Sequence, residues 1–112
     1  MIEINNLTNF AVDKKFLMGV AKKVLKGENR ERENISIAFV SSDEIKKLNQ
    51  KYRKKNKLTD VLSFKLDEED CLGEIVICPE VVKKNKEELA KMLIHGILHI
   101  LGYEHEKGTS SS

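Results

Sequence analysis

The stretch KEELAKMLIHGILHILG, residues 86–102, decides the fold, because it is the longest segment of the chain with one unbroken periodicity. Apolar side chains recur in it at helical spacing, at Leu89, Met92, Leu93, Leu98 and Leu101. Gly102 follows at the position where many helices end in a left-handed turn. The sequence therefore predicts a long amphipathic helix that ends at Gly102.

The segments upstream of this helix predict a sheet with further helices. Alternating or β-branched apolar runs at residues 2–5, 34–40, 59–66 and 73–79 indicate four strands, the last two joined by an acidic turn that contains Asp67 to Asp70. Residues 13–27 have the spacing of an amphipathic helix, and Ser41 with Glu44 forms a capping box that opens a helix of about ten residues. Before the final helix, only Pro79 breaks the pattern.

Length and composition indicate a single soluble domain. The chain has 112 residues, of which 40% are hydrophobic and 34% charged, and its net charge is +2. We expect an α+β domain over residues 1–107, with an approximately four-stranded mixed sheet packed with helices, and a disordered tail over residues 108–112. Neither a signal peptide nor a membrane span is recognisable, so we expect a cytoplasmic protein that does not bind membranes. Cys71 and Cys78 do not form a CxxC pair and are expected to be reduced thiols.

All three histidines fall within HGILHILGYEH, residues 95–105. On a helix, residues four apart lie about 40 degrees apart around the axis and one turn along it, so His95 and His99 present their rings side by side. The turn at Gly102 lets His105 fold back with a third nitrogen. Three imidazoles with one open position are typical of a catalytic zinc site, although nickel, copper or iron suit the same ligands. The alternative is that each histidine is an ordinary surface or core residue.

The spacing HxxxHxxGxxH is that of the metzincin proteases, HExxHxxGxxH, with one substitution. Gly96 stands where those proteases have the glutamate that activates water. The sequence thus predicts a zincin-like metal site on the last long helix without the protease base.

Residues 46–57 contain seven Lys or Arg and no acidic residue. A solvated helix face is one explanation of this run. Arg53 favours another, because a guanidinium can grip a phosphate with two hydrogen bonds. Thr59 and Asp60 follow, and Asp60 either orients an imidazole or caps a turn. Ser63 is expected to be a hydrogen-bonded core hydroxyl rather than a nucleophile, and Glu74 could face either a cleft or solvent.

Three stretches together resemble the YbeY family of bacterial rRNA-maturation endoribonucleases. They are LNQKYRKKNKLTDVLSF, GEIVICPEV and HGILHILGYEH, which lie between residues 48 and 105. The last is similar to that family's HGxLHLxGYDH metal motif, with Glu104 in place of the aspartate. The resemblance implies that His95, His99 and His105 bind one metal ion, usually zinc, and that Arg53 is the functionally important arginine.

The resemblance also implies an activity and partners. The substrate would be single-stranded RNA, most notably the 3′ end of 16S rRNA, and the partners would be the small ribosomal subunit and its assembly factors, with no DNA expected. Glu104 is a candidate proton acceptor or an exposed turn carboxylate, and the nucleophile is either water or the RNA's own 2′-hydroxyl. Two other hypotheses stay open, a metal-dependent peptidase with a metzincin-like site and a non-catalytic RNA-binding assembly factor.

Overall fold

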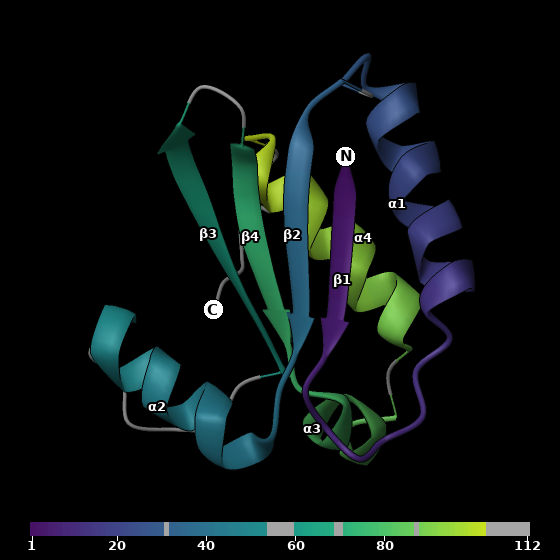
Figure 1. Cartoon of the computed structure of the whole chain (residues 1–112). Helices are drawn as coiled ribbons and strands as arrows, with labels where there is room; N and C mark the ends of the chain where they lie inside the picture. Colours follow the sequence, from purple (N-terminus) through teal and green to yellow (C-terminus); the bar gives the residue numbers. More distant parts are fainter. Residues whose placement is uncertain (31, 54–59, 69–70, 87, 103–112) are drawn as a thin grey trace.

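The chain folds into a four-stranded sheet with helices on both faces (Figure 1). The computed structural model describes residues 1–30, 32–53, 60–68, 71–86 and 88–102, and the side chains of residues 53 and 66–68 are not described. The strands are β1 (Ile2–Asn6), β2 (Asn34–Phe39), β3 (Val61–Glu68) and β4 (Cys71–Ile77). The helices are α1 (Lys14–Gly27), α2 (Ser42–Arg53), α3 (Pro79–Lys84) and α4 (Leu89–Ile100).

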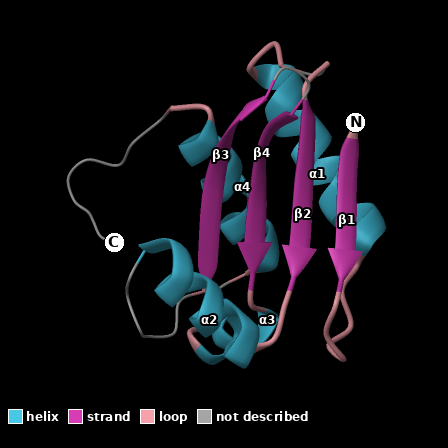
Figure 2. Cartoon of the chain, turned by 60° about the vertical axis from the view of Figure 1, so that its left-hand side comes forward, coloured by secondary structure: helices cyan, strands magenta, loops and turns pink. Residues whose placement is uncertain are grey.

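The sheet has the strand order β1-β2-β4-β3, which Figure 2 shows with α1 and α4 behind the sheet. The strands β1, β2 and β4 are parallel, and β3 pairs antiparallel with β4 at one edge. In this register Ser63 of β3 lies opposite Ile75 of β4, and Phe64 lies opposite Glu74. Successive strand residues point to opposite faces, so the side chains of Ser63 and Phe64 lie on opposite faces of the sheet.

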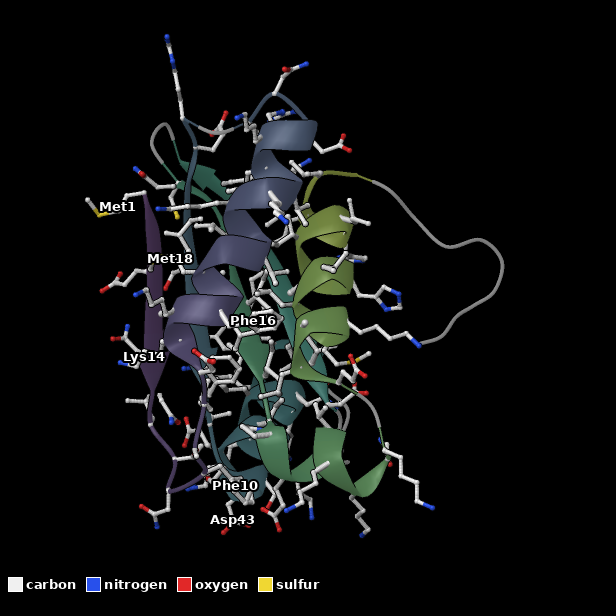
Figure 3. The ribbon with its side chains drawn as sticks, turned by 90° about the vertical axis from the view of Figure 1, so that its right-hand side faces the viewer. Met1, Phe10, Lys14, Phe16, Met18 and Asp43 are labelled. Carbon is white, nitrogen blue, oxygen red and sulfur yellow. The ribbon has the colours of Figure 1, made fainter. Side chains whose placement is uncertain are left out.

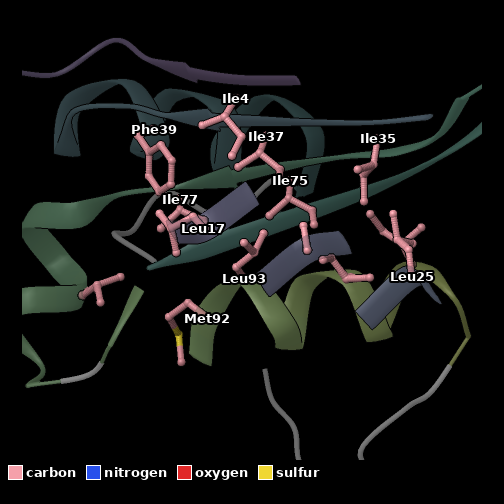
Figure 4. Close-up of a cluster of buried hydrophobic side chains, with 14 residues drawn as sticks. Ile4, Leu17, Leu25, Ile35, Ile37, Phe39, Ile75, Ile77, Met92 and Leu93 are labelled. Atoms are coloured by element: carbon pink, nitrogen blue, oxygen red, sulfur yellow. The ribbon is translucent and has the colours of Figure 1, made fainter. Parts of the chain in front are cut away.

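The helices α1 and α4 cover one face of the sheet and enclose the main core (Figure 3). Asp13 caps the start of α1, its carboxylate accepting a hydrogen bond from the Phe16 amide at 3.1 Å. Figure 4 shows how the inward side chains of both helices meet the strand residues of this face. The buried members include Ile4, Leu17, Leu25, Ile35, Ile37, Phe39, Ile75, Ile77, Met92 and Leu93.

The helix α2 packs on the opposite face, over the β3 and β4 side of the sheet. Its Ile45 is fully buried against a smaller cluster that includes Leu62, Val76 and Cys78. The predicted cap is confirmed, because the Ser41 hydroxyl accepts a hydrogen bond from the Glu44 amide at 3.2 Å. The sheet therefore separates α2 from α4.

The expected single α+β domain with a four-stranded mixed sheet is confirmed. The end of the last helix is also as predicted, with Leu101 as C-cap and Gly102 at φ 102°. The expected boundary at residue 107 and the tail at 108–112 lie outside the described residues. No helix in the described ranges is long and apolar enough to cross a membrane.

Three details differ from the sequence prediction. Asp67 and Glu68, predicted to lie in the turn, belong to β3, and β4 already begins at Cys71. Backbone pairing continues beyond the apolar residues, with Glu68 opposite Cys71, so the hairpin is tighter than expected. Pro79 begins a helix rather than only interrupting the pattern, since proline is well suited to the first helical position. The last helix begins at Leu89, not at residue 86, because Lys86 has a left-handed φ of 59° and Glu88 is extended.

Candidate metal centre beside the edge strand

The helix α4 carries two of the predicted ligands. His95 and His99 are both exposed, whereas Leu93, Ile97 and Ile100 of the same helix are buried. The four-residue spacing places both rings on one flank of the helix, one turn apart. The prediction of adjacent imidazoles on one rigid element therefore agrees with the local geometry.

Gly96 fixes how closely this helix approaches the sheet. A Cβ atom at position 96 would lie 2.9 Å from Cγ2 of Ile75 and 3.2 Å from the Ser63 hydroxyl oxygen. The backbone of α4 thus rests directly on β4 and β3, and the Ser63 hydroxyl donates a hydrogen bond to the Gly96 carbonyl at 3.5 Å. This contact confirms Ser63 as a hydrogen-bonded structural hydroxyl. It also fixes the height above the sheet of the helix segment that carries His95 and His99.

The packing role of Gly96 was missed by sequence reasoning, which treated the residue only as a replacement for a catalytic glutamate. Its neighbours along the inward face of α4 are large, namely Met92, Leu93 and Ile100. A glycine among large buried side chains on a helix is a signal of close backbone approach.

The donors suit a transition metal, but the described residues supply only part of a site. Neutral imidazoles are good ligands for zinc, copper, nickel and iron. Within the described ranges, no cluster of three or more His, Cys, Asp or Glu residues is formed. The predicted third ligand, His105, and the candidate proton acceptor Glu104 lie outside those ranges.

The two cysteines are free thiols, as predicted. Cys78 is fully buried in the α2-side cluster, across the sheet from the histidines. Burial raises the pKa of the Cys78 thiol, and the charges of Glu80 and Asp60 add to that rise, while backbone hydrogen bonds from Val81 and Glu80 oppose it. Cys78 is therefore a neutral core side chain and an unsuitable fourth ligand.

Arg53, the predicted phosphate-binding residue, is the last residue of α2. Its side chain is outside the described part, as are Lys54, Lys55 and Lys57 of the basic stretch and Thr59 after it. Its neighbour Tyr52 packs edge-on against Phe64, with ring centroids 5.2 Å apart. Because Phe64 follows Ser63 on β3, the edge strand connects the end of α2 on one face with α4 on the other.

Two acidic candidates lie away from the histidine flank. The backbone carbonyl of Asp60 accepts a hydrogen bond from the Cys78 amide at 2.9 Å, which places Asp60 at the junction of β3 with the start of α3. Glu74 is half-buried on the α2 face of the sheet, where it lines a groove with Glu44 and Leu48. Glu74 therefore faces a groove on the other side of the sheet from the histidines, and a role for it in a cleft beside them stays untested.

Comparisons with known proteins identify relatives over nearly the whole chain. Residues 3–112 match the family model described as Endoribonuclease YbeY. A protein named Endoribonuclease YbeY from Bdellovibrio bacteriovorus is 45% identical over 93 residues, covering 76% of this chain and 61% of that protein. The protein of the same name from Thermotoga maritima is 47% identical over 81 residues, covering 65% of this chain and 54% of the relative.

A longer match and a solved structure extend the comparison. The Persephonella marina protein, also named Endoribonuclease YbeY, is 39% identical over 111 residues, covering 87% of this chain and 72% of its own length. A solution structure from Thermotoga maritima superposes with a TM-score of 0.63 at 38% identity, covering 95% of this chain and 75% of that one. The matched region thus spans less than two thirds of the length of the first two relatives.

Proposed function

The chain belongs to the endoribonuclease YbeY family, and on that basis we propose that it is a metal-dependent endoribonuclease that cleaves single-stranded RNA. The observation that carries the proposal is the exposed pair His95 and His99 on α4, in a chain whose residues 3–112 match the family model. The relatives bear the name Endoribonuclease YbeY.

In this proposal His95, His99 and His105 hold one metal ion, zinc in the first instance. The ion would supply positive charge to a phosphoryl oxygen of the RNA. The protein's own contribution is rigidity, because Gly96 has no side chain and α4 therefore packs directly on the buried residues of the sheet. Since one helix carries His95 and His99, the relative positions of their backbones are set before RNA binds.

Arg53 is the proposed phosphate-binding residue. A guanidinium can donate two hydrogen bonds to a phosphate and stabilise the negative charge that accumulates as the phosphodiester bond is cleaved. The contact of Tyr52 with Phe64 anchors the end of α2 at the edge strand. Lys46, Lys47 and Lys51 on α2 would add nonspecific attraction for the RNA backbone.

Metzincin-like peptidase activity is the poorer hypothesis, because of the packing at position 96. A glutamate there would direct its Cβ into Ile75 and Ser63 rather than toward the histidine flank. The base that such a peptidase needs would therefore have to come from another residue.

We further propose that the substrate is ribosomal RNA, with the 3′ end of 16S rRNA as the main site. The small ribosomal subunit and its assembly factors would then be the partners, and the cytoplasm the place of action. These assignments rest on the family resemblance rather than on the geometry of the site.

The test is cleavage of a labelled RNA by the purified chain. We expect single-stranded RNA to be cut and an RNA duplex of the same sequence to be spared, with activity lost on chelation and restored by zinc. His99→Ala and Arg53→Ala should each reduce the rate by at least about a hundredfold, the scale of losing one charge-stabilising group. Glu88→Gln, an exposed change at the start of the same helix, should not alter it.

Two outcomes would contradict the proposal. Cleavage that persists in a folded His99→Ala variant would show that the histidines do not serve catalysis. RNA binding that depends on Arg53 without any cleavage by the wild type would instead identify a binding factor. A 2′-deoxynucleotide at the cleaved position separates the two nucleophiles, because it removes the 2′-hydroxyl and leaves attack by water intact.

A further inference from the structure

A hollow of about 460 Å³ lies at the end of the molecule where α3 meets the start of α4. Its apolar lining comes from three segments that are distant in sequence, with Phe10 in the loop after β1, Pro79 and Val82 in α3, and Leu89 at the first position of α4. Figure 3 shows Phe10 at the same end of the molecule as α3. The volume falls within the range of small-molecule sites, roughly 300–1,000 Å³.

The loop that carries Phe10 is held by its own side chains. The Asn6 amide donates to the Phe10 carbonyl at 2.8 Å, while the Asn6 side-chain oxygen accepts from the Thr8 amide and hydroxyl. The Phe10 amide in turn donates to the Thr8 hydroxyl at 3.1 Å. Phe10, which is 37% exposed, is therefore presented to the hollow from an ordered backbone.

The charged residues that line the hollow indicate which kind of ligand it can bind. Of the described residues that line the hollow, Lys83 and Lys86 are basic and none is acidic. Lys86 has a left-handed backbone conformation at φ 59°, which is uncommon for residues other than glycine. The groove on the other face of the sheet differs, because Glu44 and Glu74 line it and would repel a phosphate.

A hollow lined by an aromatic ring and two lysines suits a nucleotide of single-stranded RNA, whose base can stack on the ring while its phosphate contacts the lysines. We propose that this hollow binds one unstacked nucleotide of the substrate RNA at a distance from the cleaved bond. The inference rests on the endoribonuclease function proposed above and adds a second point of contact to it.

The helix α4 gives the separation of the two points along its axis. His95 and His99 follow Leu89 by six and ten residues, which corresponds to about 9 to 15 Å along the helix axis at about 1.5 Å per residue. At roughly 3.4 Å per stacked nucleotide, this is about three to four nucleotides. Lys91 is exposed and lies one turn before His95, where it can contact the RNA backbone between the two sites.

The first experiment measures the affinity of the full chain for a fluorescent single-stranded RNA of about ten nucleotides by anisotropy. Phe10→Leu keeps an apolar side chain but cannot stack, so we expect binding about tenfold weaker, within the range of losing one stacked base. Phe10→Tyr should bind as the wild type does. The matched control is Phe16→Leu, because Phe16 is 58% exposed on α1 and outside the hollow.

A second variant tests whether weaker RNA binding can be separated from a loss of stability. Lys86→Gly removes one ammonium group while glycine accepts the positive φ without strain, so it should weaken RNA binding without lowering thermal stability. RNAs with one abasic nucleotide, moved stepwise away from the cleaved bond, should show a loss of affinity about three to four nucleotides from it. That loss should disappear in Phe10→Leu.

The possible results separate this inference from the proposed function. If Phe10→Leu and Lys86→Gly bind RNA like the wild type while cleavage still requires His99, the hollow does not bind RNA and the proposed function stands. If Phe10→Tyr binds as weakly as Phe10→Leu, stacking is refuted. If the wild type neither binds nor cleaves RNA, both are wrong, and an apolar peptide that occupies the hollow would then identify a protein-docking site.

Discussion

Replacement of Gly96 by alanine tests the placement of α4 on the sheet. Alanine is the better helix former by about 1 kcal/mol, so a helix free of the sheet would gain stability from the change. In the structure, however, the added methyl group would lie 2.9 Å from Cγ2 and 3.2 Å from Cδ1 of Ile75. Cγ2 is attached to the β-branched carbon of a fully buried residue and cannot swing away.

The expected net effect is a loss of stability. Overpacking in a close-packed core costs about 1–3 kcal/mol, and three contacts below ordinary distance favour the upper half of that range. After subtraction of the gain in helix propensity, Gly96→Ala should be destabilised by about 1–2 kcal/mol. At about 4 °C per kcal/mol, the melting temperature should fall by about 4–8 °C.

The matched control is Gly19→Ala on α1. Gly19 is exposed within its helix, and no atom lies within 4 Å of the position where its Cβ would be. That variant should be more stable than the wild type by up to about 1 kcal/mol. Urea unfolding followed by circular dichroism measures both changes. In a double-mutant cycle with Ile75→Ala, the double mutant should lose less stability than the sum of the two single losses, because the smaller residue makes room for the methyl group.

A stability gain in Gly96→Ala equal to that in Gly19→Ala would refute the reasoning. It would mean that position 96 does not face the sheet, so α4 would be rotated and His95 and His99 would lie on a different flank.

Two further predictions concern the sheet and the buried thiol. Gly73→Ala should lower the free energy of unfolding in urea by about 2 kcal/mol or more, because its Cβ would lie 2.7 Å from the Phe64 backbone oxygen and 2.8 Å from Cδ1 of Ile100. The control is Gly27→Ala, because no atom lies within 4 Å of its Cβ position. A loss in Gly73→Ala no larger than that in the control would contradict this packing. The raised pKa of Cys78 means that the native state holds the thiol proton more tightly than the unfolded chain, whose value is near 9.0, so the unfolding free energy should fall as the pH rises above about 9. Cys78→Ala should show a smaller fall between pH 8 and pH 10, and equal slopes for the two proteins would exclude this contribution.

The sequence was sufficient for elements with a clear local signal. The Ser41 and Glu44 capping box, the end of α4 at Gly102 and the four apolar runs are local patterns, and each forms the expected element. Other features depend on contacts between distant segments. The large side chains around Gly96 signal a close approach, but they do not show that the approaching residue is Ile75. The hollow exists only because the loop at Phe10 meets α3. The helix begun by Pro79 was within reach, since proline at the first helical position is a known start signal.

For the candidate site, the i and i+4 spacing predicted correctly that His95 and His99 share the exposed side of one helix. It could not show that β3 links the histidine flank to the end of α2, because that link depends on Ser63 and Phe64 pointing to opposite faces. The assignment of the three histidines as ligands, and of Arg53 as a phosphate-binding residue, remains a prediction.

The most direct test is X-ray absorption spectroscopy at the zinc edge on protein that is active in RNA cleavage. We expect one zinc ion per chain with three imidazole nitrogens at about 2.0–2.1 Å and an exchangeable oxygen, and loss of the bound ion in His99→Ala. A sulfur ligand at about 2.3 Å, or RNA cleavage by protein that contains no metal, would contradict a catalytic site built on these histidines.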